Sequence, residues 1–563
     1  MINLKGNLGM ITRNKTPIRI LTLCCVSIGS AAAVGYAAQL TGSVADWSQQ
    51  HVPELAARQQ ARMSKAAAAP VLYGDSTPAA RRALAAAKAG GASAAIPVTG
   101  DPVKGNFSPV VDWPLIGMHA VLTPDGRVLT YGSDQNGVQT GLFNYDVWYP
   151  QLGLGPESHQ LLPNQTRVDL FCNAQLILSN GNIGLFGGDV YVDGATTNTP
   201  NDDIVEFNPA DNSMTRVGKM WRKRWYATAT TLPDGEVLLQ GGMGGNDYPE
   251  VRAVDGTYRL LTGVSTSSFD QNYPRNFVAP NGKVFGISRD AMYEIDPAGT
   301  GTIRSLGTYN GSARNWQSSA VMYAPGKILQ IGGGGNDNDP AVRTAFRIDI
   351  NGAAPQVTKT ASMTYPRHWS NATVMADGSV FVSGGSEVNN ADNGVAYTTE
   401  IYTPATGTWK LGPRAARMRL YHSASLLLPD ATVLTLGGGA PGPQTNLNAE
   451  IYYPPYLFDA SGARALRPAI VSAPMTAAPG AVLRVATTQS ASIRRFALTK
   501  TGSVTHSFDM DQRFVELAYS KAGNDFKVRL PTGYATPPGS YMLFALNGKG
   551  VPSEAALLRI NPR

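Results

Sequence analysis

Charged residues, cysteine and histidine are all scarce in this chain of 563 residues. Asp, Glu, Lys and Arg together make up 15% of it, and it holds three cysteines and six histidines. The low charged share excludes coiled coils, helical bundles and charge-rich disorder, which depend on helix-forming or like-charged runs. The chain is instead rich in turn formers, with 60 glycines and 38 prolines. This composition favours an all-β protein long enough for two or more domains.

The formal net charge of +7 is largely a property of the N-terminus. Residues 1–38 hold four basic residues and no acidic one, so the rest of the chain has 43 basic residues against 40 acidic ones. No cluster of basic residues alternates with aromatic residues, as a nucleic-acid surface would require. We therefore expect no nucleic-acid partner.

The same N-terminal residues have the pattern of a targeting segment. Their basic residues precede an uncharged, mostly apolar run at 20–38. This order is typical of a secretory signal peptide, and the length of the run also suits an uncleaved anchor. We interpret residues 1–38 as a signal peptide or a membrane anchor, and the Ala-rich residues 39–104 as a linker or stalk. Either reading predicts an exported protein.

Two of the three cysteines, Cys24 and Cys25, lie in this leader, which leaves Cys172 as the single cysteine of the remaining chain. An exported protein with one thiol has no internal disulfide. Cys172 is then either an inert buried side chain or a participant in some other chemistry.

Residues 105–457 contain a repeated unit: an apolar strand, a turn such as Pro-Asp-Gly, a second apolar strand and, in most copies, a diglycine. Seven copies are present: HAVLTPDGRVLTYGS, NAQLILSNGNIGLFGG, ATATTLPDGEVLLQGG, NFVAPNGKVFGIS, SSAVMYAPGKILQIGG, NATVMADGSVFVSGG and SASLLLPDATVLTLGG. Successive copies end roughly 45 to 57 residues apart, the length of a four-stranded blade. The repeat predicts a seven-bladed, kelch-like β-propeller, a closed ring without long exposed sheet edges.

The pattern changes in residues 458–563, which carry short alternating strands without diglycines, such as AVLRVAT, RRFALTK and SYMLFALN. This length and spacing predict a C-terminal immunoglobulin-like (early-set) β-sandwich.

The histidines form no short metal-binding motif, so any metal site has to be assembled from separate blades. Three segments place a reactive or aromatic residue directly before the first strand of a blade, where a propeller channel opens: Phe171-Cys172, Trp225-Tyr226 and Tyr421-His422. A fourth segment, GSVTHSFDMDQR, places His506 in a loop of the sandwich. Taken singly, each of these residues also has ordinary packing as an explanation.

Taken together, the stretches DLFCNAQLILSNGNIGLFGG, RWYATATTLPDGEVLLQGG, RLYHSASLLLPDATVLTLGGG and TGSVTHSFDMDQR resemble the copper radical oxidases, the family of galactose oxidase and glyoxal oxidase, in its bacterial form. The resemblance implies one copper per chain, with ligands Tyr226, Tyr421, His422 and His506. It also implies a thioether cross-link between Cys172 and Tyr226, a radical on Tyr226, and Tyr421 as the base. These residue types are suitable, because imidazole and phenolate bind Cu(II) well.

One position departs from galactose oxidase. There, a tryptophan that stacks over the thioether follows the diglycine of the blade with the radical tyrosine, whereas this chain has Met243 and Gly244. Trp316 is our candidate for the stacking residue, with ordinary packing as the alternative. Three further residues at blade starts are candidates either for substrate contact or for structural roles: Arg224, Tyr273 and Arg275.

We therefore expect an oxidase that uses O2 to convert a primary alcohol or small aldehyde into the aldehyde or acid, with release of hydrogen peroxide. The missing tryptophan favours glyoxal-like or glycan-terminal substrates over free galactose. One alternative is a non-catalytic cell-surface propeller that binds glycans or proteins. Another is a copper-binding protein without radical chemistry. We expect a monomer.

Overall fold

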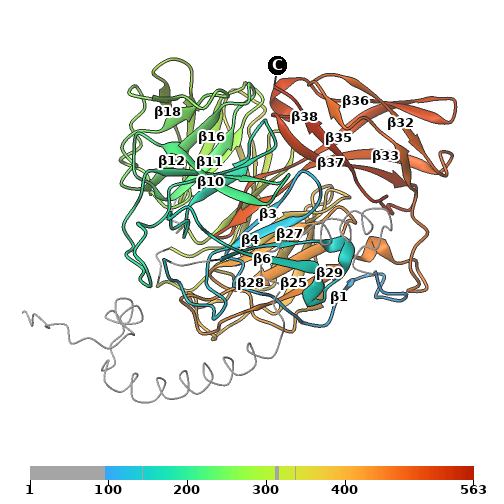
Figure 1. Ribbon diagram of the computed structural model, residues 1–563. Helices are drawn as coiled ribbons and strands as arrows, with labels where there is room; N and C mark the ends of the chain where they lie inside the picture. Colours follow the sequence, from blue (N-terminus) through green and yellow to red (C-terminus); the bar gives the residue numbers. More distant parts are fainter. Residues whose placement is uncertain (1–95, 142–143, 311–315, 336–337, 563) are drawn as a thin grey trace, which may run out of the picture. The chain divides into compact units, whose positions relative to one another are not determined.

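The computed structural model describes residues 96–141, 144–310, 316–335 and 338–562. Within these ranges the regular elements are β-strands and short 3-10 helices, which confirms an all-β protein (Figure 1). In this part of the chain, no helix is both long and apolar enough to cross a membrane. The leader expected at 1–38, and the expected linker up to residue 95, lie outside the described residues.

All seven copies of the repeat form antiparallel hairpins, and the strands of these hairpins are almost entirely buried. Five of the hairpins belong to separate sheets of four or five strands. The strands of these five sheets are β7 (Ala174–Ile177), β8 (Ile183–Phe186), β9 (Asp203–Asn208) and β10 (Ser213–Lys219); β11 (Trp225–Thr231), β12 (Val237–Met243), β13 (Glu250–Arg252) and β14 (Tyr258–Leu260); β15 (Arg275–Val278), β16 (Val284–Ser288), β17 (Ala291–Asp296) and β18 (Thr302–Thr308); β23 (Asn371–Val374), β24 (Val380–Ser383), β25 (Thr398–Thr403) and β26 (Thr408–Arg414); and β27 (Ser423–Leu427), β28 (Val433–Gly437) and β29 (Asn448–Tyr453) with β1 (Asn106–Phe107) and β2 (Val111–Asp112).

The other two hairpins start four-stranded ladders inside a single 17-stranded sheet. These ladders are β3 (His119–Leu122), β4 (Val128–Tyr131), β5 (Asn144–Trp148) and β6 (His159–Pro163), and β19 (Ser319–Ala324), β20 (Lys327–Ile331), β21 (Ala345–Asp349) and β22 (Gln356–Lys359). The rest of the sheet is the C-terminal sandwich, with β30 (Ile470–Ser472), β31 (Thr476–Ala477), β32 (Val482–Thr487), β33 (Ile493–Lys500), β34 (Ser503–Thr505), β35 (Phe508–Ala522), β36 (Asp525–Arg529), β37 (Gly539–Asn547) and β38 (Ala556–Ile560). The short 3-10 helices are η2 (Pro150–Leu152), η3 (Pro156–Ser158), η4 (Pro455–Leu457) and η5 (Gly533–Ala535).

The described residues thus form a propeller arrangement with five separate blade sheets, not the seven that the repeat predicted. The reason lies in strand pairing between domains. β34 pairs antiparallel with β3, and β35 pairs parallel with β19, so sandwich strands continue both ladders. A repeat in the sequence predicts hairpins but carries no information about a strand that joins them from another domain.

The diglycine of the repeat allows one blade to touch the next. Gly384 has a φ of 70°, and a Cβ there would lie 2.2 Å from the carbonyl oxygen of Arg419 in the following blade. That same oxygen accepts a hydrogen bond from the Gly385 amide at 2.7 Å. A side chain at Gly384 would therefore push the two blades apart.

A buried ion pair recurs beside three of these joints. Each arginine lies one to four residues before the innermost strand of a blade, and each glutamate comes from the third strand. The pairs are Arg224–Glu250 at 2.9 Å, Arg367–Glu400 at 3.0 Å and Arg419–Glu450 at 3.3 Å. Each guanidinium also donates to a diglycine carbonyl of its own blade, at Gly241, Gly384 or Gly437. Removing one partner would leave a buried charge unpaired, at a cost of about 3–5 kcal/mol.

Propeller and sandwich share one hydrophobic core in addition to their own cores. Side chains of the propeller strands, such as Val374 and Leu426, pack in the same cluster as Phe514 and Phe544 of the sandwich. A second cluster surrounds the mouth of the propeller, and a third fills the sandwich itself. The two domains are therefore held together by apolar burial as well as by strand pairing.

Substitution of Gly384 by alanine should destabilise the propeller strongly. The left-handed backbone alone costs alanine about 1 kcal/mol, and the clash with the Arg419 carbonyl adds about 1–3 kcal/mol. Gly523→Ala is a matched control, because Gly523 has a similar φ of 67° but nothing within 4 Å of its added Cβ. Chemical denaturation measures the free energy of unfolding of both variants. Equal losses of stability would mean that close contact between blades is not the reason for a glycine at position 384.

Candidate metal centre

Four of the candidate residues, and Trp369, lie at equivalent positions near the start of the innermost strands and share an unusual backbone conformation. These residues are Cys172 (φ 59°), Tyr226 (68°), Tyr273 (42°), Trp369 (58°) and His422 (66°). Left-handed backbone is rare for bulky side chains and costs about 1–3 kcal/mol at each residue. Such strain persists only where the surrounding structure enforces it, and it clusters at functional sites.

Backbone hydrogen bonds between blades enforce this conformation. The Tyr226 amide donates to the Cys172 carbonyl at 2.9 Å, and the Tyr273 amide donates to the Tyr226 carbonyl at 2.8 Å. Trp369 donates in the same way to Gln317 at 3.0 Å. The mouth of the propeller is therefore lined by residues that are linked from one blade to the next.

Three blades and the sandwich bring their reactive side chains together at this mouth. Ligand atoms of Cys172, His422 and His506 all lie within 4.8 Å of one another. The Cys172 Sγ lies 3.4 Å from His506 Nε2 and 3.8 Å from His422 Nε2. The hydroxyls of Tyr226 and Tyr421 are hydrogen-bonded to each other, and the Tyr226 side chain also interacts with the Cys172 thiol.

Both imidazoles present Nε2 to this cluster. His422 Nδ1 lies 2.8 Å from the Gly439 carbonyl oxygen, which can only accept, so the proton is on Nδ1. His506 Nδ1 lies 2.6 Å from Thr505 Oγ1, whose own proton is donated to the Met118 carbonyl at 3.0 Å. In each ring the Nε2 lone pair is therefore available to a metal ion, with its orientation fixed by the bond at the other nitrogen.

Burial shifts the pKa values of the two imidazoles, of Tyr226 and of Cys172 toward their neutral forms. It lowers the pKa of His422 to about 3 and that of His506 well below its ordinary value, so both imidazoles are neutral. It raises the pKa values of Tyr226 and Cys172 well above their ordinary values. A metal ion would therefore have to displace a phenol proton, as metal ligation requires. Two imidazoles and two phenols are a donor set that fits copper(II).

Two tryptophans contact the Tyr226 ring. The ring centroid of Trp225 lies 4.3 Å from that of Tyr226 with an interplanar angle of 49°, and that of Trp316 lies 5.5 Å away at 59°. Trp316 thus lies beside Tyr226, but it is tilted rather than parallel. Sequence reasoning missed Trp225, although counting along the hairpin places it opposite Met243, the position where galactose oxidase was expected to carry its tryptophan.

The three candidates for substrate contact have structural partners. Arg224 is fully buried against Glu250. Arg275 donates to the carbonyl oxygens of Tyr273, at 2.6 Å, and of His506, at 3.3 Å. Tyr273 stacks on the His506 ring with centroids 4.6 Å apart. Of the two readings open for these residues, the contacts favour the structural one.

His119 is a further buried residue that the sequence did not single out. Its ring stacks on Tyr131 with centroids 4.5 Å apart and lies 6.0 Å from the His506 ring. Its closest polar interaction among the described residues is with the Gln175 side chain, and neither ring nitrogen forms a hydrogen bond of ordinary geometry. Its position on β3, opposite Thr505 of the sandwich, could be known only from the strand pairing between domains.

Comparisons with known proteins agree with this geometry. A protein-family model described as "Glyoxal oxidase N-terminus" matches residues 139–457. A second family model, described as "Galactose oxidase-like, Early set domain", matches residues 467–560. A galactose oxidase of Gibberella zeae is 28% identical over 498 residues, which cover 82% of this chain and 71% of that protein. An aldehyde oxidase, GLOX, of Vitis pseudoreticulata is 26% identical over 490 residues, which cover 78% and 91%.

Among solved structures, a fungal alcohol oxidase of the AA5 family, in complex with copper, has a TM-score of 0.73 and 25% identity, and it covers 81% of this chain and 99% of its own. The propeller, the early-set sandwich and the donor set define a protein of the copper radical oxidase class. The chain belongs to the glyoxal oxidase family, whose model spans more than half of it. The resemblance to galactose oxidase and glyoxal oxidase is thereby confirmed.

The hydroxyl of Thr505 should be needed for tight copper binding. Thr505→Val preserves the shape of the side chain but removes the acceptor that orients His506, so copper affinity should fall by about 10-fold or more. Thr499→Val is the control, because the buried Thr499 hydroxyl in the same domain has no hydrogen-bond partner among the described residues. Competition with a chelator measures the copper affinity of both variants. Unchanged affinity in Thr505→Val would contradict the role of Thr505 in orienting His506.

Proposed function

We propose that this protein is a mononuclear copper radical oxidase that oxidises a primary alcohol or small aldehyde with O2 and releases hydrogen peroxide. The observation that carries the proposal is the convergence of Cys172, Tyr226, Tyr421, His422 and His506 at one mouth of the propeller. These residues come from three blades and the sandwich, and ordinary packing does not require a thiol, two phenols and two neutral imidazoles in one place.

Tyr226, Tyr421, His422 and His506 would hold the copper ion. Bound copper would supply a one-electron acceptor there, and its electron together with the hydrogen atom held by Tyr226 would reduce O2 to hydrogen peroxide. The oxidation of an alcohol removes two electrons, so a second one-electron acceptor is required. Tyr226 has this role: its phenol loses one electron and one proton to O2 beforehand, and it regains both from the substrate as a hydrogen atom.

The cross-link between Cys172 and Tyr226 sets the potential of this second electron acceptor. A bond from Sγ to a ring carbon of Tyr226 replaces one S–H and one C–H bond, and oxidant removes the two hydrogens. Sulfur donates electron density to the ring and so lowers the potential at which the phenol is oxidised. The interaction of the Cys172 thiol with the Tyr226 side chain supports this assignment.

Tyr421 accepts the proton of the substrate hydroxyl. It is partly exposed, whereas Tyr226 is 9% exposed, so Tyr421 is the phenol more open to a substrate. Its hydrogen bond to Tyr226 places the proton acceptor beside the residue that takes the hydrogen atom. Proton transfer to a positioned base and hydrogen transfer to Tyr226 can therefore occur on the same substrate carbon and its oxygen.

The surroundings of the site favour an uncharged substrate. Four arginines at or shortly before the innermost strands, Arg224, Arg275, Arg367 and Arg419, are buried with partners of their own. Aromatic side chains, including Trp225 and Trp316, surround Tyr226 instead. We propose small aldehydes, primary alcohols or the hydroxymethyl ends of glycans as the substrate class.

The five separate sheets together with the ladders β3–β6 and β19–β22 are taken as seven blades, since each of the seven starts with one repeat hairpin. The propeller is assigned to residues 105–457 and the sandwich to 458–563. The pattern of residues 1–38 supports export, with this segment as signal peptide or anchor.

The cross-link is tested most directly by intact mass. Copper-loaded protein exposed to air should be lighter by two hydrogens than the same protein purified without copper, whereas Cys172→Ser should show no such difference. A screen for peroxide release over small aldehydes, alcohols and glycans identifies the substrate. Copper binding without the mass change would establish a copper protein without radical chemistry, and the absence of copper binding would refute the proposal altogether.

The tryptophans beside Tyr226 should stabilise its oxidised form. Trp316, the candidate from the sequence, and Trp225 are both proposed to contribute, and Trp225 more strongly because it lies closer. Aromatic contacts contribute about 0.5–1.5 kcal/mol, so Trp225→Phe should speed the decay of the radical signal by about 2- to 10-fold. Trp316→Phe should have a smaller effect. Trp409→Phe, on the outer strand β26, is the control, and equal decay in all variants would contradict this role.

A further inference from the structure

His506 lies at the tip of a hairpin whose backbone is strained, so the turn itself does not hold the tip in place. β34 and β35 form the hairpin, and its two tip residues, His506 and Ser507, have φ angles of 48° and 63°. Positive φ at both central residues is the geometry of a type I′ turn, which Asn and Gly favour and which His and Ser do not. Contacts elsewhere must therefore hold the tip in the mouth of the propeller.

A bulge in β35 lies directly behind this tip. The two pairings that flank it are Phe508 with Ala320 and Arg513 with Met322. Residues 509–512, which we term the hairpin bulge, consequently have no partners in β19. A bulge bends its strand and turns side chains out of the ladder. Here the freed side chains reach blades that the hairpin does not pair with.

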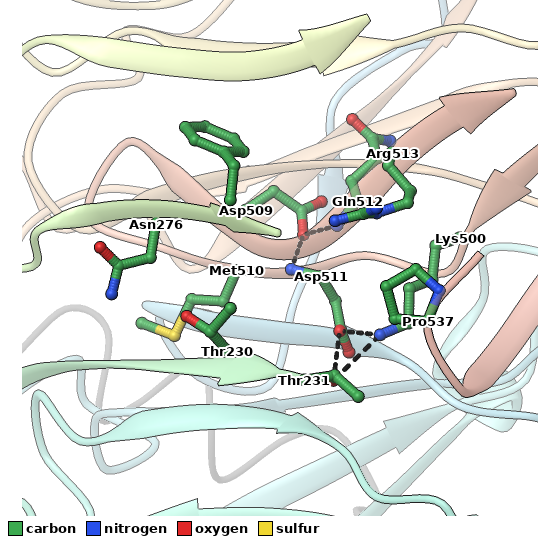
Figure 2. Close-up of a pocket in the computed structure, with 11 residues that line it drawn as sticks. Thr230, Thr231, Asn276, Lys500, Asp509, Met510, Asp511, Gln512, Arg513 and Pro537 are labelled. Carbon is green, nitrogen blue, oxygen red and sulfur yellow. Dashed lines mark hydrogen bonds and ion pairs between the residues drawn. The ribbon is translucent and has the colours of Figure 1, made fainter. Parts of the chain in front are cut away.

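Asp511 of the hairpin bulge binds two blades and the sandwich at once. Its Oδ2 accepts the Ile177 amide of β7 at 3.0 Å, and its Oδ1 lies 3.4 Å from the Thr231 hydroxyl of β11. Oδ1 also forms an ion pair with Lys500, whose ammonium donates to Thr231 at 3.1 Å. Both charged side chains are at least 98% buried. Figure 2 shows Asp511, Lys500 and Thr231 joined in this way.

Gln512 binds a third blade. Its Oε1 accepts the Val374 amide of β23 at 2.8 Å, and its Nε2 donates to the Val374 carbonyl at 3.3 Å. Asp509 shapes the hairpin bulge itself, because its Oδ1 accepts the amides of Ser503, Asp511 and Gln512 at 2.9–3.1 Å. Together with its pairings to β3 and β19, the β34–β35 hairpin thus contacts five of the seven propeller hairpins.

We propose that Asp511 and Gln512 are positioning residues that set how far the hairpin enters the propeller, and thereby where His506 Nε2 lies relative to His422 and Tyr226. This inference rests on the proposed function, because it concerns a copper ligand. The physical reason is that buried amides and a buried ammonium need their partners. Any shift of the hairpin along the channel would break the bonds to Ile177 and Val374 and leave Lys500 unpaired.

The test compares Asp511→Asn and Gln512→Ala with the wild-type protein. Both variants should bind copper about 10-fold or more weakly in competition with a chelator, in line with other residues that orient a ligand. The electron paramagnetic resonance spectrum of the Cu(II) form should also change, because the imidazole of His506 would lie differently. A loss of stability alone would not alter that spectrum.

Asp525→Asn is the matched control. Asp525 also lies in the sandwich and also forms an ion pair, with Arg484 at 2.7 Å, but Arg484 is 83% exposed and the pair lies on β32 and β36. The same carboxylate-to-amide change there should leave copper affinity and the spectrum unchanged. Wild-type affinity and spectrum in folded Asp511→Asn and Gln512→Ala would overturn the inference.

A measurement on the wild-type protein covers the case in which a variant fails to fold. Because binding and docking are reciprocally linked, copper should slow hydrogen exchange at the Asp511 and Gln512 amides. Equal exchange with and without copper would overturn the inference. A wild-type protein that binds no copper would instead refute the proposed function, so the two failures can be told apart.

Discussion

The entry of one sandwich hairpin into the propeller is the interaction on which the site depends. The hairpin of β34 and β35 pairs with β3 on one side and with β19 on another, and its bulge binds β7, β11 and β23. It brings His506 beside the propeller residues of the cluster, Cys172, Tyr226, Tyr421 and His422. Neither domain contains the complete donor set that we propose, so the proposed metal centre requires both domains.

A second constraint is the strained backbone at the mouth. Cys172, Tyr226 and His422 adopt left-handed conformations that their side chains do not favour. Hydrogen bonds between neighbouring blades compensate for this strain at Cys172 and Tyr226, and the diglycine joints bring the blades close together. The reactive side chains are therefore fixed by the propeller as a whole. A site that has to align a thiol, two phenols and two imidazoles benefits from such rigidity, because small displacements would separate ligand from metal.

Burial gives the site its electrostatic character. Burial keeps the two imidazoles neutral and raises the pKa values of the Tyr226 phenol and the Cys172 thiol, so these groups offer lone pairs to a cation without carrying charge. Arg224 and Arg419 nearby are paired with glutamates, whereas Arg275 is bonded to backbone carbonyls and its charge contributes to the lowered pKa of His506. The indoles beside Tyr226 shield its ring from water, which suits a residue that has to hold an unpaired electron.

The sequence alone determined the all-β class, the seven hairpins and the identity of the family, because hairpins, diglycine joints and site motifs are local patterns. The residues Cys172, Tyr226, Tyr421, His422 and His506 were named on resemblance, and their roles remain proposals. Only the tertiary structure decided that two ladders continue into the sandwich, that Trp225 lies closer to Tyr226 than Trp316, and that Asp511 and Gln512 anchor the hairpin. These features depend on contacts between strands hundreds of residues apart, and the register of such contacts is set by packing in three dimensions, which no local pattern encodes.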